Sequence, residues 1–233
     1  MNNYLPKYLV PAFQIIWHVE SLSSKSVLGV EFLARWVSNG QPASPADIRL
    51  VDWKQVDLDM ISTLHSAFDF NNAFFDRMFI NVSNETFSCD TAFEAWLSQL
   101  VSLKEHSGKL IVIEITEGIT PKILYSRWKS LEEKGFQMAL DDFGAYYSTL
   151  GRLSAYDWTF CKFDEQLRFS SDMVKAAEYC QKNGICMIAE RVESKEMLII
   201  ARARGMLNQQ GYYHHEPELM SFAVTTGVKY DHA

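Results

Sequence analysis

Acidic and amide side chains follow most of the apolar runs in this 233-residue chain. The clearest case is the run Gln137–Leu140, which ends in Asp141 and Asp142 and continues with Phe143 and Gly144. Two adjacent carboxylates at the end of a buried strand repel each other unless water or a cation compensates their charge. The segment therefore indicates either a solvated turn or a site that binds cations.

Polar or charged residues stand at or near the ends of the other apolar runs as well. Together with the first pair they are Glu31, Asn81, Glu114, Glu117, Asp141, Asp142, Lys162, Asp164, Glu190, Glu193 and Gln210. Any one of them alone is better explained as a helix cap or a solvent-exposed residue. In a barrel of parallel strands, however, the C-terminal strand ends converge on one face, where active sites are found. So many carboxylates on one face require cations, and oxygen ligands without matching His and Cys sets favour Mg²⁺ or Mn²⁺ over zinc.

The elements that position these residues are short apolar runs, most of them followed by a helical pattern. Strands are expected at residues 8–17, 26–36, 77–83, 109–117, 137–141, 158–164, 184–190 and 207–213. Helices are expected at residues 47–70, 91–104, 121–133, 148–153, 172–182 and 194–204. The first two strands form a hairpin, because their connection is too short for a crossover helix. About eight strands with helical crossovers predict an α/β barrel, and a doubly wound open sheet is the alternative.

Composition and charge exclude several classes of function. The net charge is −7 and no long basic run occurs, so neither DNA nor a membrane surface is an expected partner. No apolar run reaches transmembrane length and the N-terminus does not resemble a secretion signal, so a cytoplasmic protein is expected. The four cysteines contain no CxxC pair and are expected to be reduced. Residues 1–233 are expected to form a single domain.

The ordered set of motifs resembles the EAL domain family, the cyclic di-GMP phosphodiesterases with a modified TIM barrel. The name motif is present as Glu31-Phe32-Leu33, with Arg35 after it. The further matches are Asn81-Val82-Ser83, Glu114-Ile115-Thr116-Glu117, Asp141-Asp142-Phe143-Gly144, Lys162-Phe163-Asp164, Ala189-Glu190-Arg191-Val192-Glu193 and Gln210-Gly211-Tyr212. They follow the family order over about residues 8–217. The initial hairpin agrees with the antiparallel first strand of the family's (β/α)8 barrel.

The resemblance implies hydrolysis of cyclic di-GMP to linear pGpG with two divalent cations, Mg²⁺ or Mn²⁺, and inhibition by Ca²⁺. The implied metal ligands are Glu31, Asn81, Glu114, Asp141, Asp142 and Glu190. Lys162 is implied to orient and polarise the attacking water, with Glu31 and Glu190 beside it in the catalytic set. The implied substrate contacts are Arg35, Leu33, Gln210 and Asp164, and the implied supporting residues are Glu117 and Glu193.

Two departures from the family pattern lie near these residues. Arg191 replaces a Gly after Glu190, where its guanidinium is expected to pair with Glu190, to intrude on the site or to reach a phosphate. Tyr146 replaces a Gly in the loop after Asp142, the loop through which the family forms homodimers and which Glu117 is expected to pin. Neither departure removes an implied ligand or the lysine, so an active phosphodiesterase is expected.

Two other functions are compatible with the sequence. The chain could bind cyclic di-GMP or a partner protein as a regulator without hydrolysing the nucleotide. No attached sensor or cyclase domain is expected, so its own regulation would come through expression, oligomerisation or a separate partner. Alternatively, a different metal-dependent barrel enzyme would act on a phosphorylated small molecule. That enzyme would lose activity when metal is removed but would show no preference for the cyclic dinucleotide.

Overall fold

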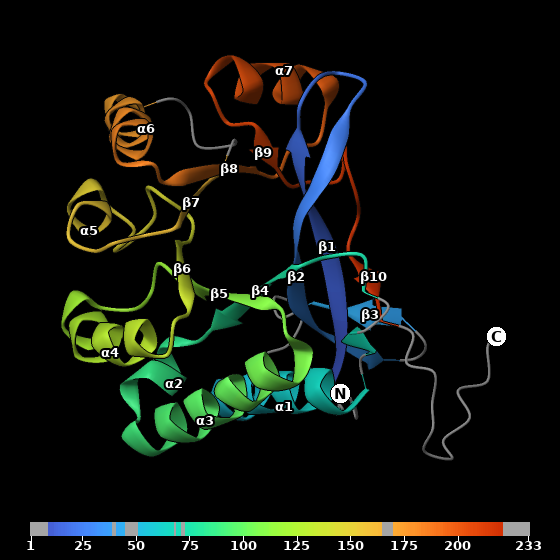
Figure 1. Cartoon of the computed structure of the whole chain (residues 1–233), viewed down its shortest axis with the longest axis vertical. Helices are drawn as coiled ribbons and strands as arrows, with labels where there is room; N and C mark the ends of the chain where they lie inside the picture. Colours follow the sequence, from blue (N-terminus) through green and yellow to red (C-terminus); the bar gives the residue numbers. More distant parts are fainter. Residues whose placement is uncertain are drawn as a thin grey trace, which may run out of the picture.

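The computed structural model describes residues 9–38, 41–44, 51–67, 69–70, 73–164 and 170–220. Within these ranges, eight strands close into the ring that Figure 1 shows face-on. They are β1 Leu9–Val19, β2 Lys25–Ser38, β4 Arg77–Val82, β5 Leu110–Ile115, β6 Gln137–Leu140, β7 Phe160–Asp164, β8 Cys186–Glu190 and β9 Asn208–Gln209. The order around the ring is β1-β9-β8-β7-β6-β5-β4-β2, and the pairing of β2 with β1 closes it.

The β1–β2 hairpin is the irregular part of the barrel. β1 runs antiparallel to both β2 and β9, whereas the other neighbouring strands of the ring are parallel. Two short strands extend this hairpin outside the ring, β3 (Gln41–Ala43) beside β2 and β10 (Glu218–Leu219) beside β1. The chain therefore forms an α/β barrel with an antiparallel first strand, as predicted, and the doubly wound alternative is wrong because the sheet has closed.

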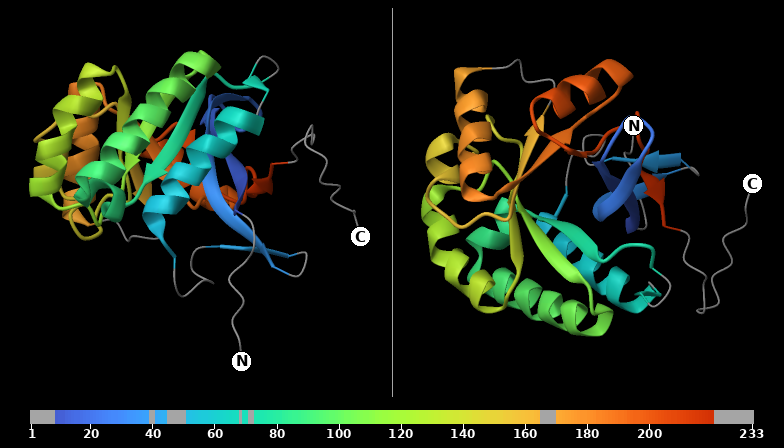
Figure 2. Two further views of the ribbon diagram at one scale, coloured as in Figure 1. Left: turned by 90° about the horizontal axis from the view of Figure 1, so that it is seen from below. Right: turned by 45° about the horizontal axis from the view of Figure 1, so that its top comes forward.

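In the described part of the chain, helices cover the outside of the ring except on the side of the β1–β2 hairpin (Figures 1 and 2). They are α1 Trp53–Ala67, α2 Asn84–Ser88, α3 Asp90–Ser107, α4 Pro121–Glu133, α5 Leu150–Leu153, α6 Ser171–Asn183 and α7 Lys195–Ala203. The hydroxyls of Thr120, Ser170 and Ser194 accept hydrogen bonds from backbone nitrogens in the first turns of α4, α6 and α7, respectively. None of these described helices combines the length and apolar character needed to cross a bilayer.

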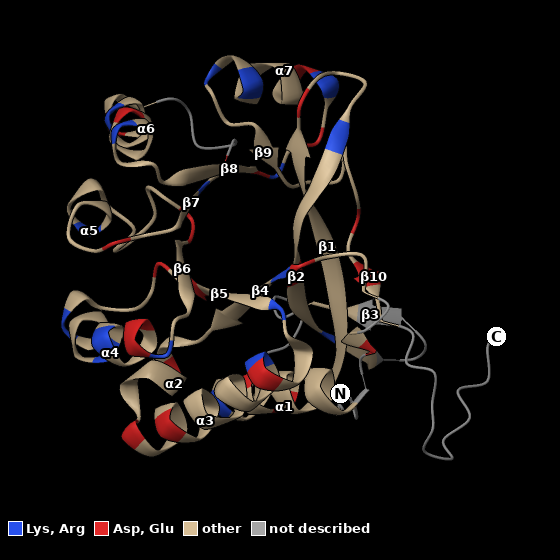
Figure 3. Cartoon of the chain, in the orientation of Figure 1, with Lys and Arg blue, Asp and Glu red and all other residues tan. Residues whose placement is uncertain are grey.

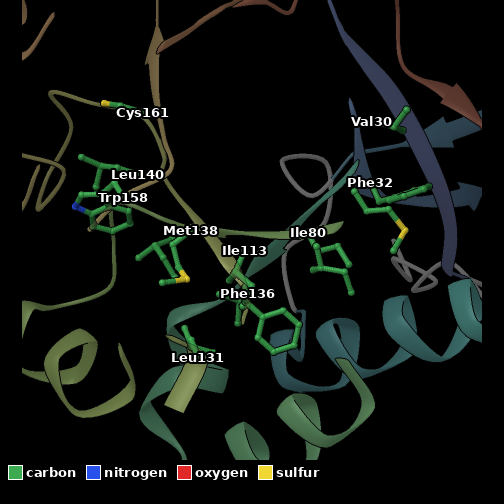
Figure 4. Close-up of a cluster of buried hydrophobic side chains, with 14 of the residues drawn as sticks. Val30, Phe32, Ile80, Ile113, Leu131, Phe136, Met138, Leu140, Trp158 and Cys161 are labelled. Atoms are coloured by element: carbon green, nitrogen blue, oxygen red, sulfur yellow. The ribbon is translucent and has the colours of Figure 1, made fainter. Parts of the chain in front are cut away.

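Alternating side chains along each strand build two apolar layers. On β5, Ile111, Ile113 and Ile115 pack against the surrounding helices, while Val112 lies inside the ring. Figure 4 shows part of the outer layer, between the strands and the helices. The inner layer fills the barrel and consists of Ile16, Phe79, Val112, Ala139, Phe160 and Ile188. It leaves no room for a side chain at position 29, where a Cβ on the glycine would lie 2.8 Å from Cε2 of Phe79.

Several predicted boundaries are wrong, each for a local reason. The last strand, expected at residues 207–213, stops at Gln209 because Gly211 turns the chain with a φ of 151°. A Cβ at Gly211 would lie 2.3 Å from the backbone nitrogen of Val192, so only glycine fits there. The helix expected at 47–70 begins at Trp53 in the described part, and residues 45–50 lie outside it. β3, β10 and α2 were not predicted, because two to five residues carry too little periodic signal.

Candidate active site

A layer of polar side chains lies immediately above the apolar filling of the barrel. Successive inward-facing positions on a strand are two residues apart, so Val112 is followed inside the ring by Glu114, and Ile188 by Glu190. The same step leads from Phe79 to Asn81, from Ala139 to Asp141 and from Phe160 to Lys162. Figure 3 shows acidic segments bordering the inside of the ring at β5, β6 and β7. The strand period thus brings the predicted metal ligands together.

Lys162 lies at the centre of this layer, almost completely buried. Its Nζ lies 2.7 Å from Glu114, 2.9 Å from Glu190, 3.1 Å from Asp141 and 3.4 Å from Glu31. Burial opposes the charged ammonium, but the four carboxylates outweigh it and raise the pKa of Lys162 well above its usual value. In this arrangement the protonated, positively charged form of Lys162 is therefore favoured.

The carboxylates around Lys162 carry more charge than the lysine compensates. When all four are ionised, one ammonium leaves a net charge of −3 in a buried volume. Burial, with the charges of Glu31 and Asp141, raises the pKa of Glu114 well above its usual range. Burial also raises the pKa of Glu190, although Lys162 opposes this. The cluster is thus electrostatically suited to additional positive charge.

Glu31 and Asp142 differ from this pair in their surroundings. Burial alone would raise the pKa of Glu31, but Lys162 and hydrogen bonds from Gln210 and Asn81 lower it. Asp142 follows β6 with a positive φ of 46°, and burial with the neighbouring Asp141 raises its pKa to about 6. Glu31 is therefore held as an anion before any cation arrives.

The donor set fits divalent cations chemically. Oε1 of Glu114 lies 2.7 Å from the ammonium of Lys162, but Oε2 of Glu114 and Oε2 of Glu190 are buried and have no donor. Buried carboxylate oxygens without donors are costly unless a cation compensates them. The described His, Cys, Asp and Glu side chains do not form a ready set of three ligands. Instead, four carboxylates surround the ammonium of Lys162.

A cavity of about 450 Å³ opens between the ends of β2 and β4, α1 and the segment after β5. It is linked to the cluster through Asn81, which lines it and donates to Glu31 at 2.9 Å. Its walls include Leu33, Arg35, Asn81 and Glu117. Arg35 is half-buried and donates to the carbonyl of Ala34 at 2.9 Å, which leaves the rest of its guanidinium for a ligand in this space. The cavity thus joins two predicted substrate contacts to a predicted metal ligand.

The family model described as EAL domain matches residues 7–217. The chain belongs to the EAL domain family.

Three relatives illustrate the range of similarity to this EAL chain. Cyclic di-GMP phosphodiesterase PdeL of Escherichia coli is 30% identical over 150 residues, which cover 59% of this chain and 41% of PdeL. Klebsiella pneumoniae BlrP1, solved as a manganese and cyclic di-GMP complex, has a TM-score of 0.73 at 24% identity and covers 92% of this chain and 57% of that one. Bacillus subtilis YkuI, solved with its substrate cyclic di-GMP and calcium, has a TM-score of 0.75 at 22% identity, with coverages of 92% and 56%. The chain therefore spans less than two thirds of these relatives, and the structural likeness shows the fold.

The two departures from the EAL pattern share a backbone feature. Arg191 and Tyr146 stand where the resemblance led us to expect glycine, and both have positive φ values, 54° and 33°. Side chains with a Cβ are strained in this region by about 1–2 kcal/mol. Arg191 pairs with Asp164 at 3.0 Å, whereas Glu190 pairs with Lys162. Arg191 thus joins the ends of β7 and β8 at the rim of the site.

The two predicted supporting residues lie apart from the lysine cluster. The side chain of Glu193 is exposed, and its backbone nitrogen contacts the sulfur of Met197. Glu117 does hold the loop after Asp142, but through its backbone carbonyl, which accepts a bond from the nitrogen of Tyr147 at 3.1 Å.

Asp57, which was not among the predicted site residues, anchors the turn after β4. Oδ2 of Asp57 accepts bonds from the nitrogen and hydroxyl of Ser83 at 3.0 and 2.6 Å and from the hydroxyl of Thr86 at 2.6 Å. This turn follows Asn81 by two residues, and Asp57 lines the same cavity. A single carboxylate within an amphipathic helix is usually solvated, so its spacing gave no signal.

The Asp57→Asn variant is expected to be more stable than the wild type at pH 7. Burial raises the pKa of Asp57 from 3.8 to about 6, although the bonds from Ser83 and Thr86 oppose it. Because the folded state binds the proton more tightly, the stability from this group is greatest below about pH 4 and is lost as the pH rises to about 6. A change of two pKa units corresponds to about 3 kcal/mol.

Urea unfolding at pH 4, 5, 6 and 7, with a chelator present, measures this effect. The gain of Asp57→Asn over wild type should grow with pH, whereas Asp59→Asn, an exposed position on the same helix, should show no such trend. A gain that does not depend on pH contradicts the expectation.

Proposed function

We propose that the chain hydrolyses cyclic di-GMP to linear pGpG with two divalent cations, Mg²⁺ or Mn²⁺. The observation that carries this proposal is the buried cluster of four carboxylates around Lys162. Asn81, which donates to Glu31 of this cluster, also lines the cavity that contains Arg35. The membership in the EAL family and the phosphodiesterase relatives support it.

The side chains suit the charges that such a reaction develops. The residues that would hold the ions are Glu31, Asn81, Glu114, Asp141, Asp142 and Glu190. Bound divalent ions supply a hydroxide near neutral pH and neutralise the phosphodiester. Lys162, which remains protonated, stabilises negative charge at the centre and orients the attacking water. Arg35 in the cavity pairs with a phosphate.

The test is hydrolysis by purified protein with Mg²⁺, with Mn²⁺, and with a chelator, followed by chromatography of the nucleotides. Metal-dependent formation of pGpG is expected, and Glu31→Ala should abolish it. Glu132→Gln, on the exposed face of α4, is the matched control and should keep full activity. Absence of product with both metals from folded protein overturns the proposal.

A receptor that binds cyclic di-GMP without hydrolysing it is the second candidate. The ion pair of Arg191 with Asp164 favours it, because Arg191 occupies a predicted substrate contact. Such a receptor would bind the nucleotide in Ca²⁺ without giving product in Mg²⁺ or Mn²⁺. In both cases we expect a homodimer through the loop after Asp142, in which the side chain of Tyr146 is 83% exposed.

A further inference from the structure

An unbroken series of hydrogen bonds connects Glu31 to a distant backbone carbonyl. Gln14, on β1, lies directly opposite Glu31 on β2 and is 7% exposed. Its Nε2 donates to the carbonyl of His215 at 2.8 Å, and its Oε1 accepts from Nε2 of Gln210 at 2.9 Å. The same nitrogen of Gln210 donates to Oε2 of Glu31 at 2.5 Å.

The two ends of this series determine the orientation of both amides. A backbone carbonyl and a carboxylate only accept hydrogen bonds, so Gln14 must turn its NH₂ group to His215 and Gln210 must turn its own to Glu31. The carbonyl oxygen of Gln14 then takes the second hydrogen of Gln210. Turning either amide over would place two acceptors against each other. Each side chain therefore has one orientation that satisfies all three bonds.

The outer end of the series is fixed by other contacts of His215. Its ring stacks on Phe13 with the centroids 5.5 Å apart, and its Nε2 lies 3.1 Å from Glu218 of β10. The backbone nitrogen of Ile15 contacts its Nδ1 at 3.5 Å. The strand β10, which lies outside the barrel, thus helps to hold the segment that orients Gln14.

The inner end of the series leaves one atom unused. Oε1 of Gln210 is buried and accepts no hydrogen bond. It is a neutral acceptor on the side chain that donates to Glu31, whereas the acceptors around Lys162 are carboxylates. With both hydrogens of Gln210 engaged, this oxygen is held ready for a water or a substrate hydroxyl.

We propose that Gln14 is a positioning residue of the active site, which fixes the amide of Gln210 so that it donates to Glu31 and presents Oε1 as an acceptor. This inference rests on the proposed phosphodiesterase function. Gln14 acts through Gln210 and is not itself a catalytic residue. Without Gln14, one hydrogen of the buried Gln210 amide has no acceptor. We expect the correct orientation of this amide to become about tenfold less favoured.

A double-mutant cycle tests the proposal, because Gln14→Met and Gln210→Met keep the side-chain volume but remove the hydrogen bonds. Gln14→Met should lower kcat about tenfold while KM changes less than about twofold. The double variant should be no slower than Gln210→Met alone. The control is Gln137→Met, which should keep the wild-type kcat. It removes a partly buried amide at the start of β6 that accepts a hydrogen bond from Arg77. The proposal is overturned if the losses of kcat in the two single variants multiply in the double variant. It is also overturned if kcat is unchanged in Gln14→Met.

A second readout does not depend on turnover. In the metal-free wild type, the side-chain NH₂ resonances of Gln210 should exchange slowly with water in NMR spectra, and Gln14→Met should remove this protection. Rapid exchange in the wild type overturns the proposal even if the enzyme is active. If the exchange is slow but the protein does not hydrolyse cyclic di-GMP, the hydrogen bonds from Gln14 to Gln210 and Glu31 are supported. Only the phosphodiesterase function is then rejected.

Discussion

Replacing Glu114 by Gln is expected to stabilise the metal-free protein while abolishing hydrolysis. Glu114 is fully buried, and burial with the charge of Glu31 outweighs the ion pair with Lys162 and raises its pKa. Its neutral isostere reduces the repulsion from Glu31 and Asp141, so the free energy of unfolding should rise by about 1–3 kcal/mol. The same change removes a proposed metal ligand, so kcat/KM should fall by about 10³ or more.

Urea unfolding in a chelator and hydrolysis assays in Mn²⁺ measure the two effects. Glu132→Gln makes the same chemical change on an exposed helix face and should alter neither quantity. A Glu114→Gln variant that is less stable than the wild type without metal would contradict the charge imbalance derived from the cluster. A fully active variant would remove Glu114 from the metal site.

Replacing Lys162 by Met should have the opposite effect on stability and the same effect on activity. Methionine fills a similar volume, but four buried carboxylates then lose their common cation. Removing one partner from buried ion pairs costs about 3–5 kcal/mol. Hydrolysis should fall by about 10³ because the positive charge at the centre of the site is lost.

The pH dependence of the Lys162→Met variant separates this explanation from simple misfolding. Without Lys162 the pKa values of Glu114 and Glu190 should rise further, so the folded state takes up more protons. Its stability relative to wild type should therefore be lowest near pH 8 and recover toward pH 5. Urea unfolding at these two pH values is the measurement, and an equal loss at both would reject repulsion between carboxylates as the cause.

The fold could be predicted because it depends on local patterns. Apolar runs of strand length followed by helical periodicity specify the alternation of elements, and the short connection at Glu20–Ser24 forces a hairpin. Helix starts could also be predicted from the sequence, as Thr120 before Pro121 illustrates. Strand ends were harder to predict. Gly211, for example, ends β9 through a close approach to Val192, which lies 19 residues away in the chain.

The proposed site divides in the same way. The sequence by itself determined which chemistry is available, since the two-residue period of a strand places Asn81, Glu114 and Glu190 inside the barrel once the strands are recognised. Only the tertiary structure decided how these groups interact. Lys162 pairs with four carboxylates and Arg191 pairs with Asp164. Gln14 accepts a hydrogen bond from Gln210, which lies 196 positions away in the sequence. The physical reason is that hydrogen bonds and ion pairs depend on the register between distant strands. That register is fixed only when the ring closes, and a local pattern does not encode it.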